Sequence, residues 1–78
     1  MAQKRHNRKE AQARETHKKI LMAAAELFAR QGYHKTTITD ISQAVNLTSG
    51  AVFHHFQSKE ALLEAVVDWL ARGITIYS

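Results

Sequence analysis

The chain has 78 residues, a formal net charge of +4, no cysteine, no proline and three glycines. A chain of this length forms one domain at most, and the lack of cysteine excludes disulfides and thiolate metal sites. No apolar run reaches the roughly 20 residues that span a bilayer, and the N-terminus lacks the apolar stretch of a signal peptide. Abundant Ala, Leu, Glu, Gln and Lys favour helices, and we expect a cytoplasmic protein.

The positive charge is concentrated at the start of the chain. Residues 1–19 hold seven basic residues and two acidic ones, whereas residues 20–78 hold four basic and five acidic residues. We expect residues 1–13 to form a flexible basic arm that attracts polyanions. A solvated tail that only keeps the protein soluble would have the same composition, and charge alone does not separate the two.

A helix is predicted from about Arg14 to Gln31. Gly32 follows it as the expected left-handed stop, and Tyr33 can fold back over the last turn. The apolar residues of this segment fall on a single stripe at helical spacing. The stripe comprises Ile20, Leu21, Ala24, Leu27 and Phe28.

A short second helix is predicted after a loop at His34 and Lys35. Thr37 opens it, and Asp40 three residues later completes a Thr-x-x-Asp capping pattern. The helix ends at Asn46, because asparagine is the commonest residue after glycine to accept left-handed dihedral angles. Its inner face comprises Ile38, Ile41, Ala44 and Val45.

Thr48 is the predicted N-cap of a third short helix. Within it, Val52 and Phe56 are four residues apart and face inward. The positions that point the other way are Ser49, Gly50, Phe53 and His54.

A fourth helix is predicted from its cap at Ser58 to about Arg72, where Gly73 can break it. Glu60 lies in the first turn, where the helix dipole favours an anion. Trp69 is expected to belong to the core or to an interface rather than to a base-stacking surface. The predicted buried stripe comprises Leu62, Leu63, Val66, Val67 and Leu70.

Two short helices joined by three or four residues have the shape of a helix-turn-helix, here over about residues 37–56. In that motif the front of the second helix enters the major groove, which is about 12 Å wide. Small side chains at Ser49, Gly50 and Ala51 suit such an approach. Glycine inside a helix costs about 1 kcal/mol relative to alanine, and close approach to another surface is one reason to tolerate it. Packing of this helix on its neighbours within the chain is the other.

The chain carries a long ordered set of residues at fixed spacing. The set comprises Ile20-Leu21-x-x-Ala24-x-x-Leu27-Phe28-x-x-x-Gly32-Tyr33, then Thr36-Thr37-x-x-x-Ile41, then Leu47-Thr48-x-Gly50-Ala51-Val52-Phe53-His54-His55-Phe56-x-Ser58-Lys59-Glu60-x-Leu62. It resembles the TetR family of bacterial repressors, with the resemblance extending over roughly residues 14–74. The resemblance implies an all-α fold in which a three-helix helix-turn-helix bundle is followed by a fourth helix.

The resemblance also implies a function. We expect sequence-specific DNA binding within a transcriptional regulator, as a repressor that a small ligand releases. In the family a larger C-terminal domain binds that inducer and forms the homodimer, and this domain would lie outside the 78 residues. The expected DNA is double-stranded with a palindromic operator, in the bacterial cytoplasm at the nucleoid. No membrane, cofactor or metal is expected.

Site residues follow from the matched positions. The base-edge candidates are Thr48, Ser49, Gly50, Ala51 and Phe53. The phosphate candidates are Thr37, Thr39, His54, His55 and Lys59. The arm adds Lys4, Arg5, Arg8 and Lys9 for an adjacent minor groove or the DNA backbone.

Lys59 is singled out by its position in the first turn of the fourth helix, where the helix dipole disfavours a cation. An external anion such as a DNA phosphate would explain a lysine there. A solvated surface lysine is the plainer interpretation.

Three positions depart from the family pattern. Asn46 replaces the usual glycine, which its tolerance of left-handed dihedral angles accommodates. Phe53 replaces the common tyrosine, so a phosphate hydrogen bond from the hydroxyl is lost. His17 lies near a position where arginine is common, which lowers the expected surface charge.

Two other classes of function compete with DNA binding. An enzyme needs a nucleophile, a base and an orienting group around a pocket, and four short helices hardly enclose one, so no catalytic residue is assigned. The adjacent His54 and His55 point about 100° apart on a helix and suit no metal chelate, although His55 lies nearer the packed face. The remaining alternative is a helical protein-interaction module that uses the apolar surface of the fourth helix and the C-terminal residues.

Overall fold

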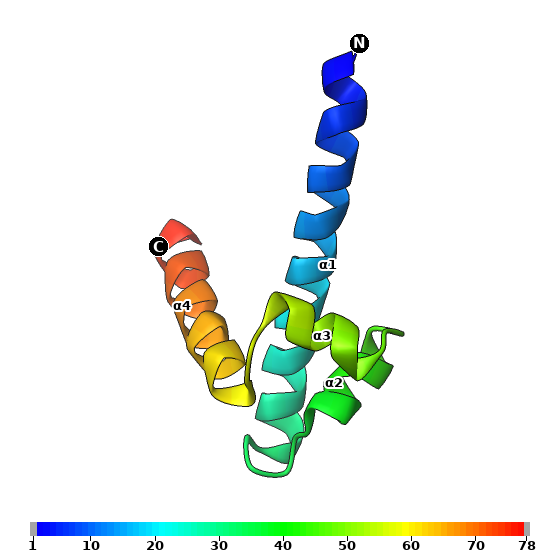
Figure 1. The fold of residues 1–78 in the computed structure, drawn as a ribbon. Helices are drawn as coiled ribbons and strands as arrows, with labels where there is room; N and C mark the ends of the chain where they lie inside the picture. The colour runs from blue at the N-terminus through cyan, green and yellow to red at the C-terminus, as the bar shows by residue number, and fades with distance from the viewer. Residues whose placement is uncertain (1, 78) are drawn as a thin grey trace.

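The computed structural model describes the backbone of residues 2–77 and the side chains of residues 11–72. The described backbone forms four helices and no strand: α1 (Ala2–Gln31), α2 (Ile38–Ala44), α3 (Ser49–His55) and α4 (Lys59–Tyr77). Both α2 and α4 pack against α1, and α3 packs on α2. The N-terminal half of α1 extends beyond the other helices (Figure 1). The predicted all-α fold, with a fourth helix after a three-helix bundle, is confirmed.

The first helix begins earlier than the sequence analysis predicted. It begins at Ala2 rather than Arg14, so residues 2–13 continue the backbone of α1 instead of forming a separate arm before it. This segment contains neither glycine nor proline and consists largely of Ala, Gln, Lys, Arg and Glu. These are strong helix formers, and nothing in the segment stops a helix.

The fourth helix also runs further than predicted, through Gly73 to Tyr77 instead of ending near Arg72. A single glycine in a helix interior costs about 1 kcal/mol, which lowers stability without imposing an end. Within the part of the chain that is described, no helix has the length and apolar character needed to cross a membrane.

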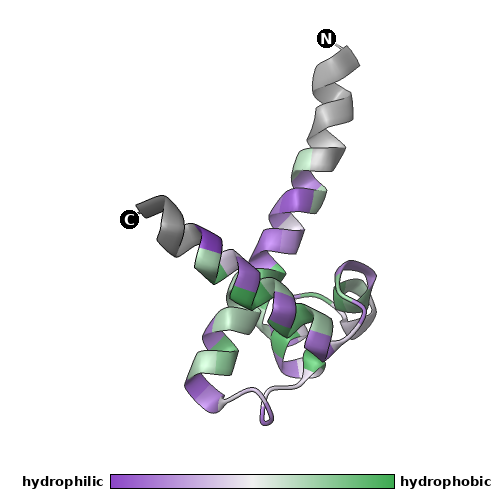
Figure 2. Ribbon diagram, turned by 90° about the vertical axis from the view of Figure 1, so that its left-hand side faces the viewer, coloured by the Kyte–Doolittle hydropathy of each residue, from purple (hydrophilic) through white to green (hydrophobic). Residues whose placement is uncertain are grey.

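The core is a single cluster to which all four helices or their end residues contribute. The hydrophobic stretches of the ribbon, green in Figure 2, gather where the helices meet. Leu27, Phe28 and Trp69 pack on it while partly exposed, which agrees with the expectation that Trp69 belongs to the core or an interface. The buried apolar residues are Ile20, Leu21, Ala24, Ile41, Val52, Phe56, Leu62 and Val66.

The predicted stripe of α4 is only partly correct. Leu62 and Val66 are buried, but Val67 is 57 % exposed and Leu70 is 45 % exposed. The inward face of α4 follows Leu62, Val66 and Trp69. Because adjacent residues of a helix lie about 100° apart, the positions directly after Val66 and Trp69 turn away from α1. For the same reason Ala44 is exposed at the end of α2, although it was assigned to the inner face.

The two predicted left-handed turns are confirmed. Gly32 ends α1 with a φ of 91°, and its N–H donates to the Phe28 carbonyl oxygen at 3.0 Å. Asn46 joins α2 to α3 with a φ of 61°, and the next N–H, that of Leu47, donates to the Ser42 carbonyl oxygen at 2.8 Å. The ends of α1 and α2 are therefore each followed by a residue that tolerates this conformation.

Replacing Gly32 with alanine is expected to lower the free energy of unfolding by about 1–2 kcal/mol, because a Cβ strains the left-handed backbone. No heavy atom lies within 4 Å of a Cβ built at Gly32, so the loss would come from backbone strain rather than from a clash. Urea denaturation measures the effect. Asn46→Gly is the matched control and should be neutral or stabilising, and an unchanged stability of Gly32→Ala would contradict the prediction.

Candidate nucleic-acid interface

The two helices of the helix-turn-helix begin at side-chain caps. The Asp40 N–H donates to the Thr37 Oγ1 at 3.1 Å, and the Thr37 N–H donates back to the Asp40 Oδ2 at 3.1 Å. The second of these bonds holds the pKa of the Asp40 carboxyl below its ordinary value. The Ala51 N–H donates to the Thr48 Oγ1 at 3.1 Å. Both predicted caps are confirmed, and the Thr48 hydroxyl keeps its own proton to donate to an outside acceptor.

The seven-residue helix α3 has one buried side and one exposed side. Val52 is fully buried, and Phe56 directly after the helix is 6 % exposed. On the other side Gly50 and His54 are exposed, and the large Phe53 ring is 45 % exposed. This division agrees with the orientation that the sequence predicted. An exposed aromatic ring beside small side chains is a surface suited to contact with a partner.

No packing contact within the chain requires a glycine at position 50. A Cβ built on this residue would meet only the Thr48 Oγ1, at 3.9 Å, which is an ordinary van der Waals distance. The chain therefore has room for alanine, which helices prefer by about 1 kcal/mol. The sequence left two explanations for this glycine, and the geometry removes packing on neighbouring helices as the cause.

The phosphate candidates surround α3 on two sides. Thr37 and Thr39 are exposed at the front of α2, and His54 is exposed in the last turn of α3. His55 is partly buried, and burial lowers the pKa of its imidazole, as do the nearby His17 and His54. The side chains of the arm candidates Lys4, Arg5, Arg8 and Lys9 lie outside the described residues.

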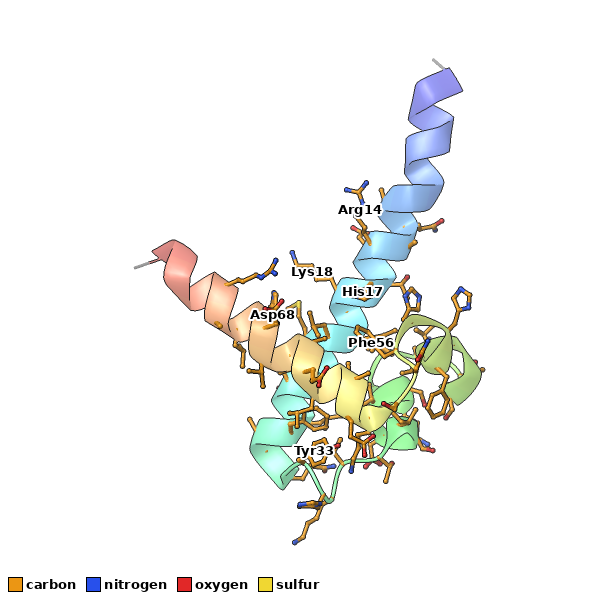
Figure 3. The ribbon with its side chains drawn as sticks, turned by 60° about the vertical axis from the view of Figure 1, so that its left-hand side comes forward. Arg14, His17, Lys18, Tyr33, Phe56 and Asp68 are labelled. Atoms are coloured by element: carbon orange, nitrogen blue, oxygen red, sulfur yellow. The ribbon has the colours of Figure 1, made fainter. Side chains whose placement is uncertain are left out.

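Lys59 joins the start of α4 to the turn between α1 and α2. Its Nζ donates to the carbonyl oxygens of Tyr33 at 2.9 Å and of Thr36 at 3.1 Å. The same ammonium lies 4.3 Å from the centroid of the Tyr33 ring, which adds a cation–π contact. Figure 3 shows Tyr33 in this turn, beside the start of α4. These contacts explain a lysine in the first turn of α4 without an external anion, a reason that the sequence did not reveal.

The turn that Lys59 contacts contains a buried hydroxyl. Thr36 is fully buried, and its Oγ1 lies 2.8 Å from the Gly32 carbonyl oxygen. Gln31 Nε2 donates to this hydroxyl at 3.4 Å and to the Asp40 carboxylate at 3.3 Å. Through these bonds the turn fixes where α2 and its cap Thr37 begin. Sequence reasoning missed Thr36 because a threonine in a polar loop carries no signal of burial.

His17 is the second functional candidate that sequence reasoning missed. Its ring stacks on Phe56 with a centroid distance of 4.4 Å and an interplanar angle of 28°. Figure 3 shows the two side chains next to each other. It also lies 5.8 Å from the His55 ring, which in turn lies 5.7 Å from His54. The helical register offered a signal, because residue 17 precedes the buried Leu21 by four positions and so lies on the inward stripe of α1.

The described region contains no cluster of metal-ligating side chains. Among side chains 11–72, no three His, Cys, Asp or Glu residues are placed to hold a metal ion. An open hollow of about 610 Å³ lies between α1, the end of α2 and Trp69. Its polar lining consists of Lys19, Glu26 and Asn46.

Comparison with known proteins identifies the class. The family model described as bacterial regulatory proteins, tetR family, matches residues 20–66, which include α2, α3 and the turn between them. The chain therefore belongs to this family, and its helices form the family's helix-turn-helix domain. The prediction made from the sequence is confirmed on both points.

Several curated relatives support the assignment. The HTH-type transcriptional repressor KstR2 of Mycolicibacterium smegmatis is 42 % identical over 55 residues, covering 65 % of this chain and 27 % of that protein. The A-factor receptor protein of Streptomyces griseus is 40 % identical over 60 residues, covering 77 % and 22 %. The HTH-type transcriptional regulator TtgR of Pseudomonas putida is 36 % identical over 63 residues, covering 81 % and 30 %. The chain spans less than a third of the length of these relatives.

Replacing Lys59 with methionine is expected to lower the free energy of unfolding by about 1–3 kcal/mol, because two charge-assisted hydrogen bonds to backbone carbonyls are lost. Urea denaturation at moderate salt measures the loss. Lys35→Met is the matched control, since Lys35 is exposed in the same turn, and it should change stability by less than about 0.5 kcal/mol. Equal stability of the two variants would show that the Lys59 contacts contribute nothing to the fold.

Proposed function

We propose that this chain binds specific sequences of double-stranded DNA, with α3 in the major groove, as the DNA-binding part of a transcriptional regulator. The observation that carries the proposal is Gly50, which is exposed on α3 and which no contact within the chain requires. A groove that admits a helix demands small residues where the helix backbone comes closest. Membership of a family of bacterial regulatory proteins supports the same function.

The front of α3 is the proposed base-reading surface. Thr48 and Ser49 would donate or accept hydrogen bonds at base edges, and Ala51 would allow the close approach that Gly50 begins. The exposed ring of Phe53 would pack on a thymine methyl group or a deoxyribose. The absence of a hydroxyl at Phe53 removes one phosphate contact, so specificity rests on the apolar contact there.

The proposed phosphate contacts lie on both sides of that surface. Thr37 and Thr39 would meet one strand at the front of α2, and His54 and His55 the other at the end of α3. Lys59 joins the set, because two of its three ammonium N–H groups donate to carbonyl oxygens and the third is left for a phosphate. The basic residues Lys4, Arg5, Arg8 and Lys9 would reach the backbone or an adjacent minor groove.

The longer relatives suggest how the domain would work in a whole protein. Their names include a repressor and a receptor, and each extends well beyond the matched segment. We propose a homodimer that binds a palindromic operator in the bacterial cytoplasm at the nucleoid. A small ligand bound in a further domain would then change the separation of the two α3 helices and release the DNA.

Selection of bound sequences from a random DNA pool, followed by titration of the selected duplex at several salt concentrations, tests the function. Each neutralised phosphate steepens the fall of log affinity with log salt by about 0.9. Neutralisation of four phosphates, for example, predicts a roughly hundredfold loss of affinity between about 50 and 200 mM salt. Recovery of no common sequence, together with an affinity that hardly changes with salt, would overturn DNA binding and leave a protein-interaction module as the function.

Gly50→Ala is expected to change stability and DNA affinity in opposite directions. The variant should be more stable by about 0.5–1 kcal/mol, because alanine is the better helix former and meets no obstacle within the chain. Its affinity for the selected duplex should fall at least roughly tenfold, since a methyl group would separate α3 from the groove by more than a hydrogen bond tolerates. Urea denaturation and fluorescence anisotropy measure the two effects.

Ala29→Gly is the control for the Gly50 variant, because Ala29 is exposed on α1 outside the helix-turn-helix. It should lose about 1 kcal/mol of stability and retain the affinity of the folded protein. A Gly50→Ala protein that binds the duplex as tightly as the wild type would show that the backbone of α3 does not come close to DNA.

A further inference from the structure

We propose that His17, His54 and His55 form a single proton-binding site that contacts a DNA phosphate in its protonated form, so that DNA binding takes up protons. The inference rests on the proposed function and extends it to a residue of α1 that the matched family segment does not include and that the resemblance gave no DNA contact. The matched segment begins at residue 20, three positions after His17.

The site is built by a contact between α1 and the end of α3. The His17 ring stacks on Phe56, which is buried in the core, so the imidazole is held against the end of α3 although most of it is exposed. The rings of His17 and His54 lie 5.8 Å and 5.7 Å from the ring of His55. Three imidazole rings therefore lie within one small surface.

No acidic group of the described region is among the charges that act on His55. The charges that act on His55 are those of His17 on α1 and His54 on α3, and none from α2 or α4 contributes. The ion pairs Glu26–Arg30 and Asp68–Arg72 join neighbours within α1 and within α4.

These surroundings oppose protonation in the free protein. Burial and the two neighbouring imidazoles lower the pKa of His55 below its ordinary 6.5. A phosphate at the end of α3 would favour the protonated imidazole instead, because an imidazolium donates a charge-assisted hydrogen bond that a neutral ring nitrogen cannot make. The complex would then bind more protons than the free protein, and its affinity would rise as the pH falls, by up to about tenfold per pH unit for each proton taken up.

Folding responds to pH with the opposite sign. The pKa of His55 is lower in the folded protein than in the unfolded chain, so the unfolded chain binds more protons once the pH falls below about 6.5. The stability that neutral His55 contributes is present above that pH and is lost as the pH falls. A rise in DNA affinity at low pH therefore cannot come from a more stable fold.

The test is an NMR titration of the imidazole protons of the 78-residue chain, without DNA and with a short duplex of random sequence at constant ionic strength. A random duplex suffices because phosphate contacts do not depend on base sequence. We expect the duplex to raise the pKa of His17, His54 and His55 by about half a unit to one unit. His34 is the internal control, since it is exposed in the turn after α1 and, among the described aromatic rings, its partner is Tyr33 rather than a member of the cluster.

Each outcome is decisive. An equal rise at His34 would indicate the general potential of DNA and would overturn the site. A rise at His54 and His55 without His17 would remove the α1 member and overturn the proposal as stated, and a duplex that binds without moving any of the three would do the same. Failure to bind the duplex at any pH would instead overturn the proposed function itself.

A variant measures the contribution of His17 directly. His17→Phe keeps an aromatic ring on Phe56 and removes the titrating group, whereas His34→Gln removes an imidazole outside the cluster. Between pH 8 and pH 6 the wild type and His34→Gln should gain about tenfold in affinity, and His17→Phe clearly less, about threefold. An equal gain in all three proteins would contradict a role for His17.

Discussion

The ammonium of Lys59 is the contact on which the arrangement of the helices depends. It binds two carbonyl oxygens of the turn after α1 from the first residue of α4, and so joins the end of one long helix to the start of the other. Thr37 opens α2 directly after this turn, and α2 positions α3 through the left-handed residue Asn46. One side chain thus connects the packing of α1 and α4 to the placement of the helix-turn-helix.

Local signals in the sequence predicted most of the fold, and contacts between distant residues account for what they missed. The caps at Thr37 and Thr48 and the stop at Gly32 depend on neighbours within four residues, so sequence spacing reveals them. The partners of Lys59 lie 26 and 23 positions away, and no spacing rule connects them. The start of α1 was predicted too late because a run of positive charge is also typical of a flexible arm, although residues 2–13 consist largely of strong helix formers.

The candidate site shows the same division. Small residues at the front of α3 indicated the outward surface, and the structure adds that Gly50 has no partner within the chain that would require it. His17 entered the sequence analysis only as a departure from the family pattern, whereas its ring lies on Phe56 beside His55. A family pattern assigns roles only to the residues that members share. For a residue that departs from the pattern, such as His17, the contacts in the structure indicate the role.

The unbroken course of α1 has a mechanical consequence. A helix of 30 residues is about 45 Å long, and α1 contains no glycine or proline at which it could bend, so its two ends move together. One end is the basic start of the chain, and the other is the turn that fixes the entrance of α2. Because α1 moves as one rigid rod, an anion bound at its N-terminal end would also affect the angle at which α3 approaches DNA.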